Sequence, residues 1–202
     1  MSDCDKNRND IPEHYKRRIK QLLYEYNRPF PGPYYFARLL RGKNKVKIAD
    51  LGSGPVCTLG NIWGNVEISI IASDLRAEAY LKLIQPFGVK LITPLEYQDM
   101  ENLTYEDESF DVVHCVNALD HTPNAKAALC EMQRICKVGG YIYLRHAHNQ
   151  KTAHKGRGHF WDIKAEGITN GIETIKLEKG WKTIDDGDFV ISIYHKEKSV
   201  NF

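Results

Sequence analysis

An acidic residue and two closely spaced glycines form the most chemically specific pattern in the chain. Asp50, Gly52 and Gly54 close a short apolar run, and a second apolar run ends at Asp74. Glycines at such a turn let the backbone approach a ligand closely. A carboxylate at the end of the next strand can accept hydrogen bonds from both hydroxyls of a ribose. The pattern therefore predicts a ribose-containing ligand at the carboxyl edge of a parallel sheet.

Histidines provide the second group of candidate residues. Asp120 and His121 follow another apolar run, and four more histidines lie between Arg145 and Trp161. A histidine can serve as a general base, and a neighbouring carboxylate can orient it. We predict His121 as the base, Asp120 as its orienting or substrate-binding partner, and His148 as a further catalytic candidate. A structural loop histidine remains the alternative for His121. The predicted substrate-binding residues are His146, His154, His159 and Trp161.

The spacing of these histidines does not predict a metal centre. It matches neither HExxH nor a zinc ribbon, and no acidic residue lies among them before Asp162. The five cysteines form no CxxC pair. The cysteine pattern and a polar first segment without signal-peptide character favour a cytoplasmic location. We therefore predict no metal site and keep one in the histidine cluster as the alternative.

Alternating strands and helices must position these side chains. Apolar runs predict strands at 46–51, 68–73, 89–93, 110–116 and 141–146. Helical spacing predicts helices at 11–27, 34–40, 77–84 and 125–136, the last stopped by Gly139 and Gly140. Later runs at 172–177 and 189–195 suit a hairpin-like end to the sheet. The chain is thus predicted to be an α/β protein, doubly wound around a mostly parallel sheet with an antiparallel C-terminal end.

Length and composition are those of an ordinary globular domain. The chain has 202 residues, of which 42% are hydrophobic and 27% charged, which excludes disordered, collagen-like and coiled-coil classes. No apolar run approaches the ~20 residues of a membrane span. Residues 1–47 carry a net charge of +7 and residues 48–202 one of −5. We predict a basic helical cap over 1–45 and the main domain over 46–202.

Five segments in order resemble the class I S-adenosylmethionine-dependent methyltransferases, whose fold is Rossmann-like. The resemblance covers residues 46–147. Asp50-Leu-Gly52-Ser53-Gly54 is similar to the family's glycine motif, and Asp74 to its acidic ribose ligand. The segments 99–103, 109–121 and 129–140 are similar to the family's adenine segment, fourth-strand region and fifth-strand region. The resemblance implies S-adenosylmethionine as cofactor, bound by Asp50, Gly52, Ser53, Gly54, Asp74, Leu75, Asp99, Met100, Cys115 and Val116.

The glycine turn departs from the family pattern at its third glycine. That position is Val56, which predicts a stiffer loop than usual. The nicotinamide fingerprint Gly-x-Gly-x-x-Gly is broken as well, because its third glycine falls on Cys57. The sequence therefore favours a methyltransferase over an oxidoreductase.

Motifs around the acceptor site narrow the substrate class. The Asn/Asp-Pro-Pro-aromatic motif of amino-directed nucleic-acid methyltransferases is missing, because the matching segment 117–120 reads Asn-Ala-Leu-Asp. Residues 158–162, Gly-His-Phe-Trp-Asp, are similar to methyltransferases of surface-glycan and nucleotide-sugar pathways. We predict O-methylation of a small-molecule, nucleotide-sugar or glycan-linked substrate, without nucleic acid or membrane insertion. An RNA methyltransferase and a non-catalytic partner subunit remain alternatives, and the oligomeric state stays open.

Overall fold

The computed structural model describes residues 10–33, 39–155, 158–177 and 180–197. It divides into two compact units, residues 1–99 and residues 100–202. The boundary expected between residues 45 and 46 stays a prediction. Most of the helix expected at 34–40 lies outside the described residues.

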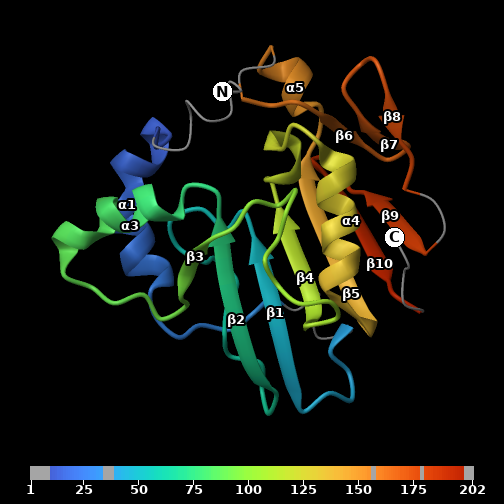
Figure 1. Ribbon diagram of the computed structural model, residues 1–202. Helices are drawn as coiled ribbons and strands as arrows, with labels where there is room; N and C mark the ends of the chain where they lie inside the picture. The colour runs from blue at the N-terminus through green and yellow to red at the C-terminus, as the bar shows by residue number, and fades with distance from the viewer. Residues whose placement is uncertain (1–9, 34–38, 156–157, 178–179, 198–202) are drawn as a thin grey trace. The chain divides into compact units, whose positions relative to one another are not determined.

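The first unit is built on three parallel strands. They are β1 (Lys45–Leu51), β2 (Glu67–Asp74) and β3 (Leu95–Tyr97), in the order β3-β2-β1 (Figure 1). Lys45 pairs with Glu67 and Leu51 with Ser73, so β1 and β2 end at the same level. This register brings the glycine turn after β1 next to the acidic end of β2, as parallel pairing requires.

In the described part of the first unit, two helices and a short 3-10 turn accompany these strands. They are α1 (Glu13–Tyr26), α3 (Ala77–Ile84) and η2 (Gln85–Phe87). α1 is amphipathic, and its buried residues Ile19 and Leu23 share a hydrophobic cluster with Val56 and Ile84. The first helix of the chain therefore packs against the segment that follows the glycine turn.

The strand predicted at 89–93 is wrong, because the third strand comes later and is only three residues long. β3 pairs with β2 from Leu95 onward. The side chain of Asn27, at the end of α1, instead accepts from the Ile92 N–H and donates to the Lys90 carbonyl. These side-chain bonds satisfy backbone groups that a strand would have paired with its neighbour.

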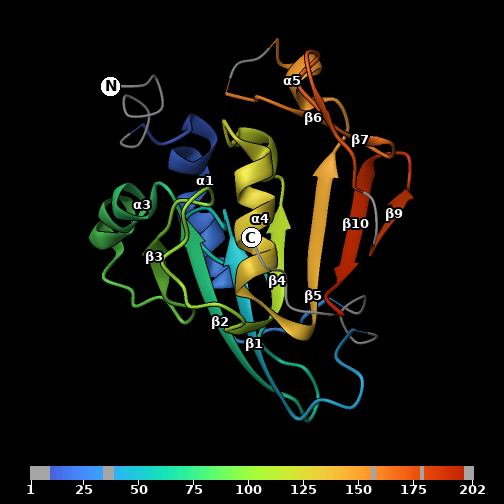
Figure 2. The same cartoon turned by 45° about the vertical axis from the view of Figure 1, so that its right-hand side comes forward.

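The second unit contains four neighbouring strands of the main sheet, in the order β4-β5-β10-β9 (Figure 2). They are β4 (Phe110–Val116), β5 (Cys136–Ala147), β9 (Trp181–Asp185) and β10 (Phe189–His195). β4 and β5 run parallel, whereas β10 is antiparallel to both β5 and β9. With the parallel strands of the first unit, this pattern confirms the predicted α/β class with antiparallel C-terminal strands.

Helical segments of the second unit lie before and after β5. They are the 3-10 turn η3 (Leu119–His121), α4 (Ala125–Ile135) and α5 (Gln150–Ala153). α4 ends at Ile135, so the expected stop at Gly139 and Gly140 is wrong. Both glycines lie inside β5, where their backbone groups pair with Lys196. Pairing with the chain beyond β10 lengthens β5, a contact invisible to local spacing.

A small antiparallel sheet follows the carboxyl end of β5 (Figure 2). It contains β6 (Asp162–Lys164), β7 (Gly167–Thr169) and β8 (Thr174–Ile175). The strand expected at 172–177 is thus reduced to two residues, and β6 and β7 were not predicted. Among the described residues, no helix has both the length and the apolar character needed to cross a membrane.

Candidate functional site

The turn after β1 has the backbone geometry that its glycines permit. Gly52 and Gly54 have φ angles of +69° and +71°, which residues with a Cβ rarely adopt. The N–H groups of Gly52 and Ser53 donate to the Ser73 carbonyl at 2.8 and 3.0 Å. These two bonds attach the turn to the last residues of β2.

Asp74 connects the glycine turn to the start of α3. Its Oδ2 accepts from the Gly54 N–H at 3.0 Å, and its Oδ1 accepts from the Arg76 N–H at 2.8 Å. Leu75, between Asp74 and Arg76, is half-buried. The carboxylate is therefore held in one orientation at the carboxyl end of β2, where the sequence predicted a ribose ligand.

Asp50 supports the same turn from within the first unit. It is buried, and its Oδ2 accepts from the Cys57 thiol at 3.2 Å. Burial, and after it the charge of Asp50, raises the pKa of Cys57, so the thiol remains a protonated donor. This contact favours a supporting role for Asp50 beside the cofactor role that the resemblance implies.

Tyr15 of α1 is a candidate site residue that sequence reasoning missed. A Cβ placed on Gly54 would lie 2.8 Å from the Tyr15 hydroxyl oxygen. Burial, followed by the charge of Asp74, raises the pKa of Tyr15, and its ring meets Tyr80 edge-on with centroids 5.4 Å apart. The sequence showed Tyr15 only as one apolar position of an amphipathic helix, which carries no signal for a site.

The other predicted cofactor residues lie at the boundary between the two units and at the end of β4. Asp99, the last residue of the first unit, is half-buried, as are Met100 and Val116 of the second unit. Cys115, on β4, is fully buried, and its sulfur lies 3.9 Å from that of Met100. The structure thus brings Met100 and Cys115 into contact within the second unit.

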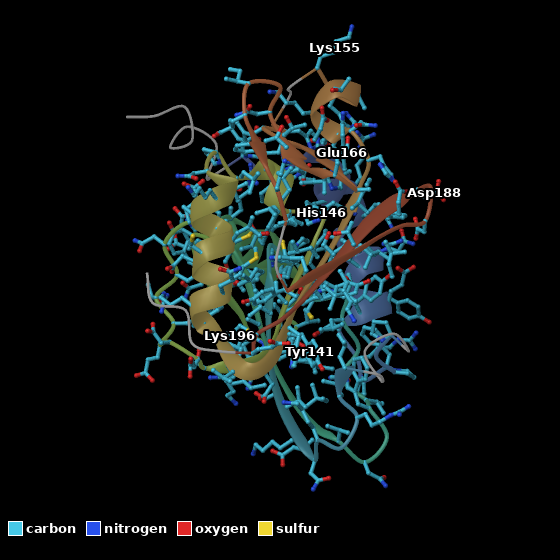
Figure 3. The ribbon with its side chains drawn as sticks, turned by 90° about the vertical axis from the view of Figure 1, so that its right-hand side faces the viewer. Tyr141, His146, Lys155, Glu166, Asp188 and Lys196 are labelled. Atoms are coloured by element: carbon cyan, nitrogen blue, oxygen red, sulfur yellow. The ribbon has the colours of Figure 1, made fainter. Side chains whose placement is uncertain are left out.

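His146 accepts hydrogen bonds from the backbone of the turn that contains Asp120 and His121. It is 1% exposed, and its Nε2 accepts from the N–H groups of Ala118 and Leu119 at 3.3 and 3.1 Å. Figure 3 labels it among the interior side chains on β5. Burial lowers the pKa of His146 to about 4, so the ring is neutral at neutral pH. This geometry favours a positioning role rather than the predicted contact with substrate.

A buried carboxylate and two histidines meet beside this turn. Asp120 is 2% exposed, and its Oδ2 lies 2.5 Å from Nδ1 of His159 and 4.0 Å from Nε2 of His121. Nδ1 of His121 instead lies 2.5 Å from the carbonyl oxygen of Gly158. Asp120 therefore orients His159, a residue predicted to bind substrate, more directly than it orients the predicted base His121.

Two further contacts attach the loop before β6 to the same turn. The Phe160 N–H donates to the Asp120 carbonyl at 2.7 Å, and the Trp161 indole N–H donates to the Thr122 carbonyl at 2.8 Å. Trp161 is 2% exposed. The burial and the hydrogen bond indicate that Trp161 holds the loop in place.

The two remaining predicted histidines, His154 and His148, have different partners. The ring of His154, which is exposed, stacks on that of His159 with centroids 4.7 Å apart. His148 instead bonds Asp185 of β9 through Nε2 at 2.9 Å. The structure therefore adds His154 to the histidine cluster and gives His148 a different partner, so a catalytic role for His148 stays a prediction without a supporting contact.

Comparisons with known proteins identify a methyltransferase domain in this chain. Residues 49–144 match a methyltransferase domain family. Sterol methyltransferase-like 1 of Botryococcus braunii is 23% identical over 154 residues, which are 74% of this chain and 39% of that protein. Ubiquinone biosynthesis O-methyltransferase of Xanthomonas oryzae pv. oryzae is 29% identical over 101 residues, which are 48% of this chain and 41% of that protein. The chain therefore spans about two fifths of the length of these relatives.

A solved structure extends the likeness in fold to nearly the whole chain. A candidate S-adenosyl-L-methionine-dependent methyltransferase of Methanococcus maripaludis aligns with a TM-score of 0.55 at 18% identity. The alignment covers 93% of this chain and 94% of that one. The chain thus carries a methyltransferase domain with a Rossmann-like fold. Its domain and its fold are those of class I S-adenosylmethionine-dependent methyltransferases.

Proposed function

We propose that this chain transfers the methyl group of S-adenosylmethionine to a hydroxyl oxygen of a small-molecule or glycan-linked acceptor. We propose oxygen as the methylated atom because buried Asp120 contacts His159. A hydroxyl must lose a proton as it is methylated, whereas an amine can react once it is desolvated. A histidine held by a buried carboxylate suits the first task.

In the proposed reaction, histidines of the second unit remove the proton of the acceptor hydroxyl. When bound, S-adenosylmethionine supplies a methyl group on a positively charged sulfur. The acceptor oxygen forms the new bond to the methyl carbon as the carbon–sulfur bond breaks, and the electron pair of that bond stays on sulfur. His159 accepts the hydroxyl proton at Nε2, because Nδ1 is directed at Asp120. His121, whose Nδ1 bonds the Gly158 carbonyl, is the second candidate for that base.

Cofactor binding in the first unit is assigned to Asp74 and the glycine turn. The carboxylate lies at the carboxyl end of β2, held by the N–H groups of Gly54 and Arg76. Asp74→Asn should weaken binding of S-adenosylhomocysteine by about tenfold or more, because an amide accepts the ribose hydroxyls less strongly than a carboxylate. Glu67→Gln, at the other end of β2, is the matched control and should bind as the natural chain does. Equal affinity of Asp74→Asn would remove Asp74 from this role.

The other cofactor assignments rest on the resemblance. They are Asp50, Ser53, Leu75 and Asp99 in the first unit, and Met100, Cys115 and Val116 in the second. Buried Cys115 is assigned the role of shaping the site through Met100 rather than offering a polar contact.

The acceptor class is inferred from the loop before β6 and from the relatives. Exposed His154 and half-buried His159 offer hydrogen bonds suited to a hydroxyl-rich molecule. An O-methyltransferase among the relatives supports oxygen as the acceptor atom. A nucleotide-sugar or surface-glycan precursor is our first candidate. A cytoplasmic location stays a prediction.

Calorimetric titration with S-adenosylhomocysteine, with NADH as the control ligand, tests the cofactor directly. Micromolar binding of S-adenosylhomocysteine alone supports the proposal, whereas failure to bind either ligand favours the non-catalytic partner subunit. Acceptors are then screened with methyl-labelled S-adenosylmethionine. Label transferred to an RNA mixture, with binding that falls steeply with salt, would instead indicate an RNA methyltransferase.

A further inference from the structure

We propose that Asp120, His121 and His159 form a binding site for a divalent transition-metal ion of the zinc class. One ligand atom from each of the three side chains lies within 4.8 Å of the other two. Asp120 and His121 are consecutive in η3, and His159 comes from the loop before β6. This inference goes beyond the proposed methyl transfer, which requires no metal ion.

One oxygen of the buried carboxylate at the centre of the group lacks a hydrogen-bond partner. Asp120 is 2% exposed, and its Oδ1 is buried without a hydrogen-bond partner among the described residues. A buried carboxylate oxygen that is left unsatisfied is costly, and such atoms in folded proteins usually have a partner. A cation bound by both oxygens of the Asp120 carboxylate and by the two neighbouring imidazoles would provide that partner.

His121 has the orientation expected of a metal ligand. Its Nδ1 lies 2.5 Å from the Gly158 carbonyl oxygen, so Nδ1 carries the hydrogen and Nε2 carries the lone pair. That Nε2 lies 4.0 Å from Oδ2 of Asp120. Metal-binding histidines commonly donate their other ring N–H to a carbonyl in this way. The side chain of His121 is 45% exposed, which gives an ion access from solvent.

The types of the ligand atoms select the class of ion. Two imidazoles and one carboxylate suit zinc, cobalt or nickel, whereas magnesium and calcium prefer oxygen ligands. Zinc–nitrogen bonds of about 2.0–2.1 Å place tetrahedral ligands about 3.3 Å apart. The 4.0 Å separation of Asp120 from His121 and the 2.5 Å contact of Asp120 with His159 would each change by less than about 1 Å. His154, stacked on His159, places another imidazole beside the group.

The sequence predicted no metal site because spacing rules compare ligands that are close along the chain. His159 is separated from Asp120 by 39 positions, and only the folded loop brings it near. Coordination through Nδ1 of His159 would leave the ring hydrogen on Nε2, and coordination through Nε2 of His121 would occupy its lone pair, so neither ring could accept the acceptor's proton. The metal-bound form is therefore expected to be inactive in methyl transfer, and a chelator should restore activity.

Direct metal binding by the full chain tests the proposal without reference to activity. We would titrate metal-free protein with Co²⁺, record the visible absorption of the bound ion, and then displace it with Zn²⁺. The expected result is one ion per chain, with visible bands of tetrahedral intensity that zinc abolishes. His121→Gln and His159→Gln should each weaken binding by about tenfold or more. His121 is the more exposed, so its variant is the less prone to misfold.

His148→Gln is the matched control, because His148 also bonds an aspartate but has no third ligand group among the described residues. It should bind cobalt as the natural chain does. Failure to bind cobalt, or equal loss in the His148 variant, would overturn the proposal. So would unchanged binding in both His121→Gln and His159→Gln, provided that circular dichroism shows the variants folded. None of these results bears on S-adenosylhomocysteine binding, which tests the methyltransferase separately.

Discussion

His146 should make the second unit sensitive to acid, and its structural setting gives the size of the effect. Nε2 of the ring accepts from two backbone N–H groups, those of Ala118 and Leu119. A protonated ring would present an N–H to these donors and lose both bonds. Burial lowers the pKa of His146 to about 4, from an ordinary value of 6.5. That shift corresponds to roughly 3 kcal/mol of stability at most.

The sign follows from the lowered pKa. Because the unfolded chain binds the proton more readily than the folded chain, the contribution is complete above pH 6.5 and is lost as pH falls towards about 4. His146→Leu removes the titrating group but leaves two buried N–H donors without an acceptor. We expect it to cost about 1–3 kcal/mol at neutral pH. The difference from the natural chain should then shrink as the natural chain loses its own contribution in acid.

Urea unfolding at a series of pH values measures this difference. Val190→Ala is the matched control, because Val190 pairs with His146 across the β5–β10 ladder, is buried and does not titrate. Its cost, about 1–3 kcal/mol from the cavity it leaves, should not depend on pH. If the curves of the natural chain and His146→Leu stay parallel between about pH 4 and pH 8, the acceptor role of the neutral ring is refuted.

Four further outcomes are expected. Gly54→Ala should destabilise the chain by about 1–3 kcal/mol and weaken S-adenosylhomocysteine binding, because its Cβ meets the Tyr15 hydroxyl. Gly64→Ala, with a similar φ of +59° but open space around it, should cost less in urea unfolding and leave binding unchanged. Trp161→Phe should lower stability by about 1–2 kcal/mol through the lost indole hydrogen bond, and an unchanged denaturation midpoint would contradict this. His159→Gln should reduce kcat by about 100-fold or more with unchanged S-adenosylhomocysteine affinity, and undiminished turnover would exclude it as the base. Saturating zinc should inhibit turnover and a chelator should reverse that inhibition, whereas activity lost to the chelator alone would show that the reaction requires metal.

Local features of the sequence determined the class of fold and the part of the site formed by the glycine turn and Asp74. The strand at 110–116, the helix at 77–84 and the strand at 189–195 have the predicted bounds, because their apolar patterns reflect burial along one element. The glycine turn and Asp74 were also readable, since a turn with positive φ requires glycine and parallel strands end at a common edge.

Tertiary contacts decided the remainder. The third strand begins at Leu95 because pairing with β2 begins there. β5 extends back to Cys136 because Cys136 pairs with Phe110 of β4, and Gly139 and Gly140 pair with Lys196 beyond β10. Two contacts of the candidate site join residues that are 39 positions apart in the sequence. They are the contact of Asp120 with His159 and that of Tyr15 with Gly54. Periodicity reports only which face of an element is buried. Which side chains meet across such separations depends on the folded path of the intervening chain, and that path brings the acid and the histidines together.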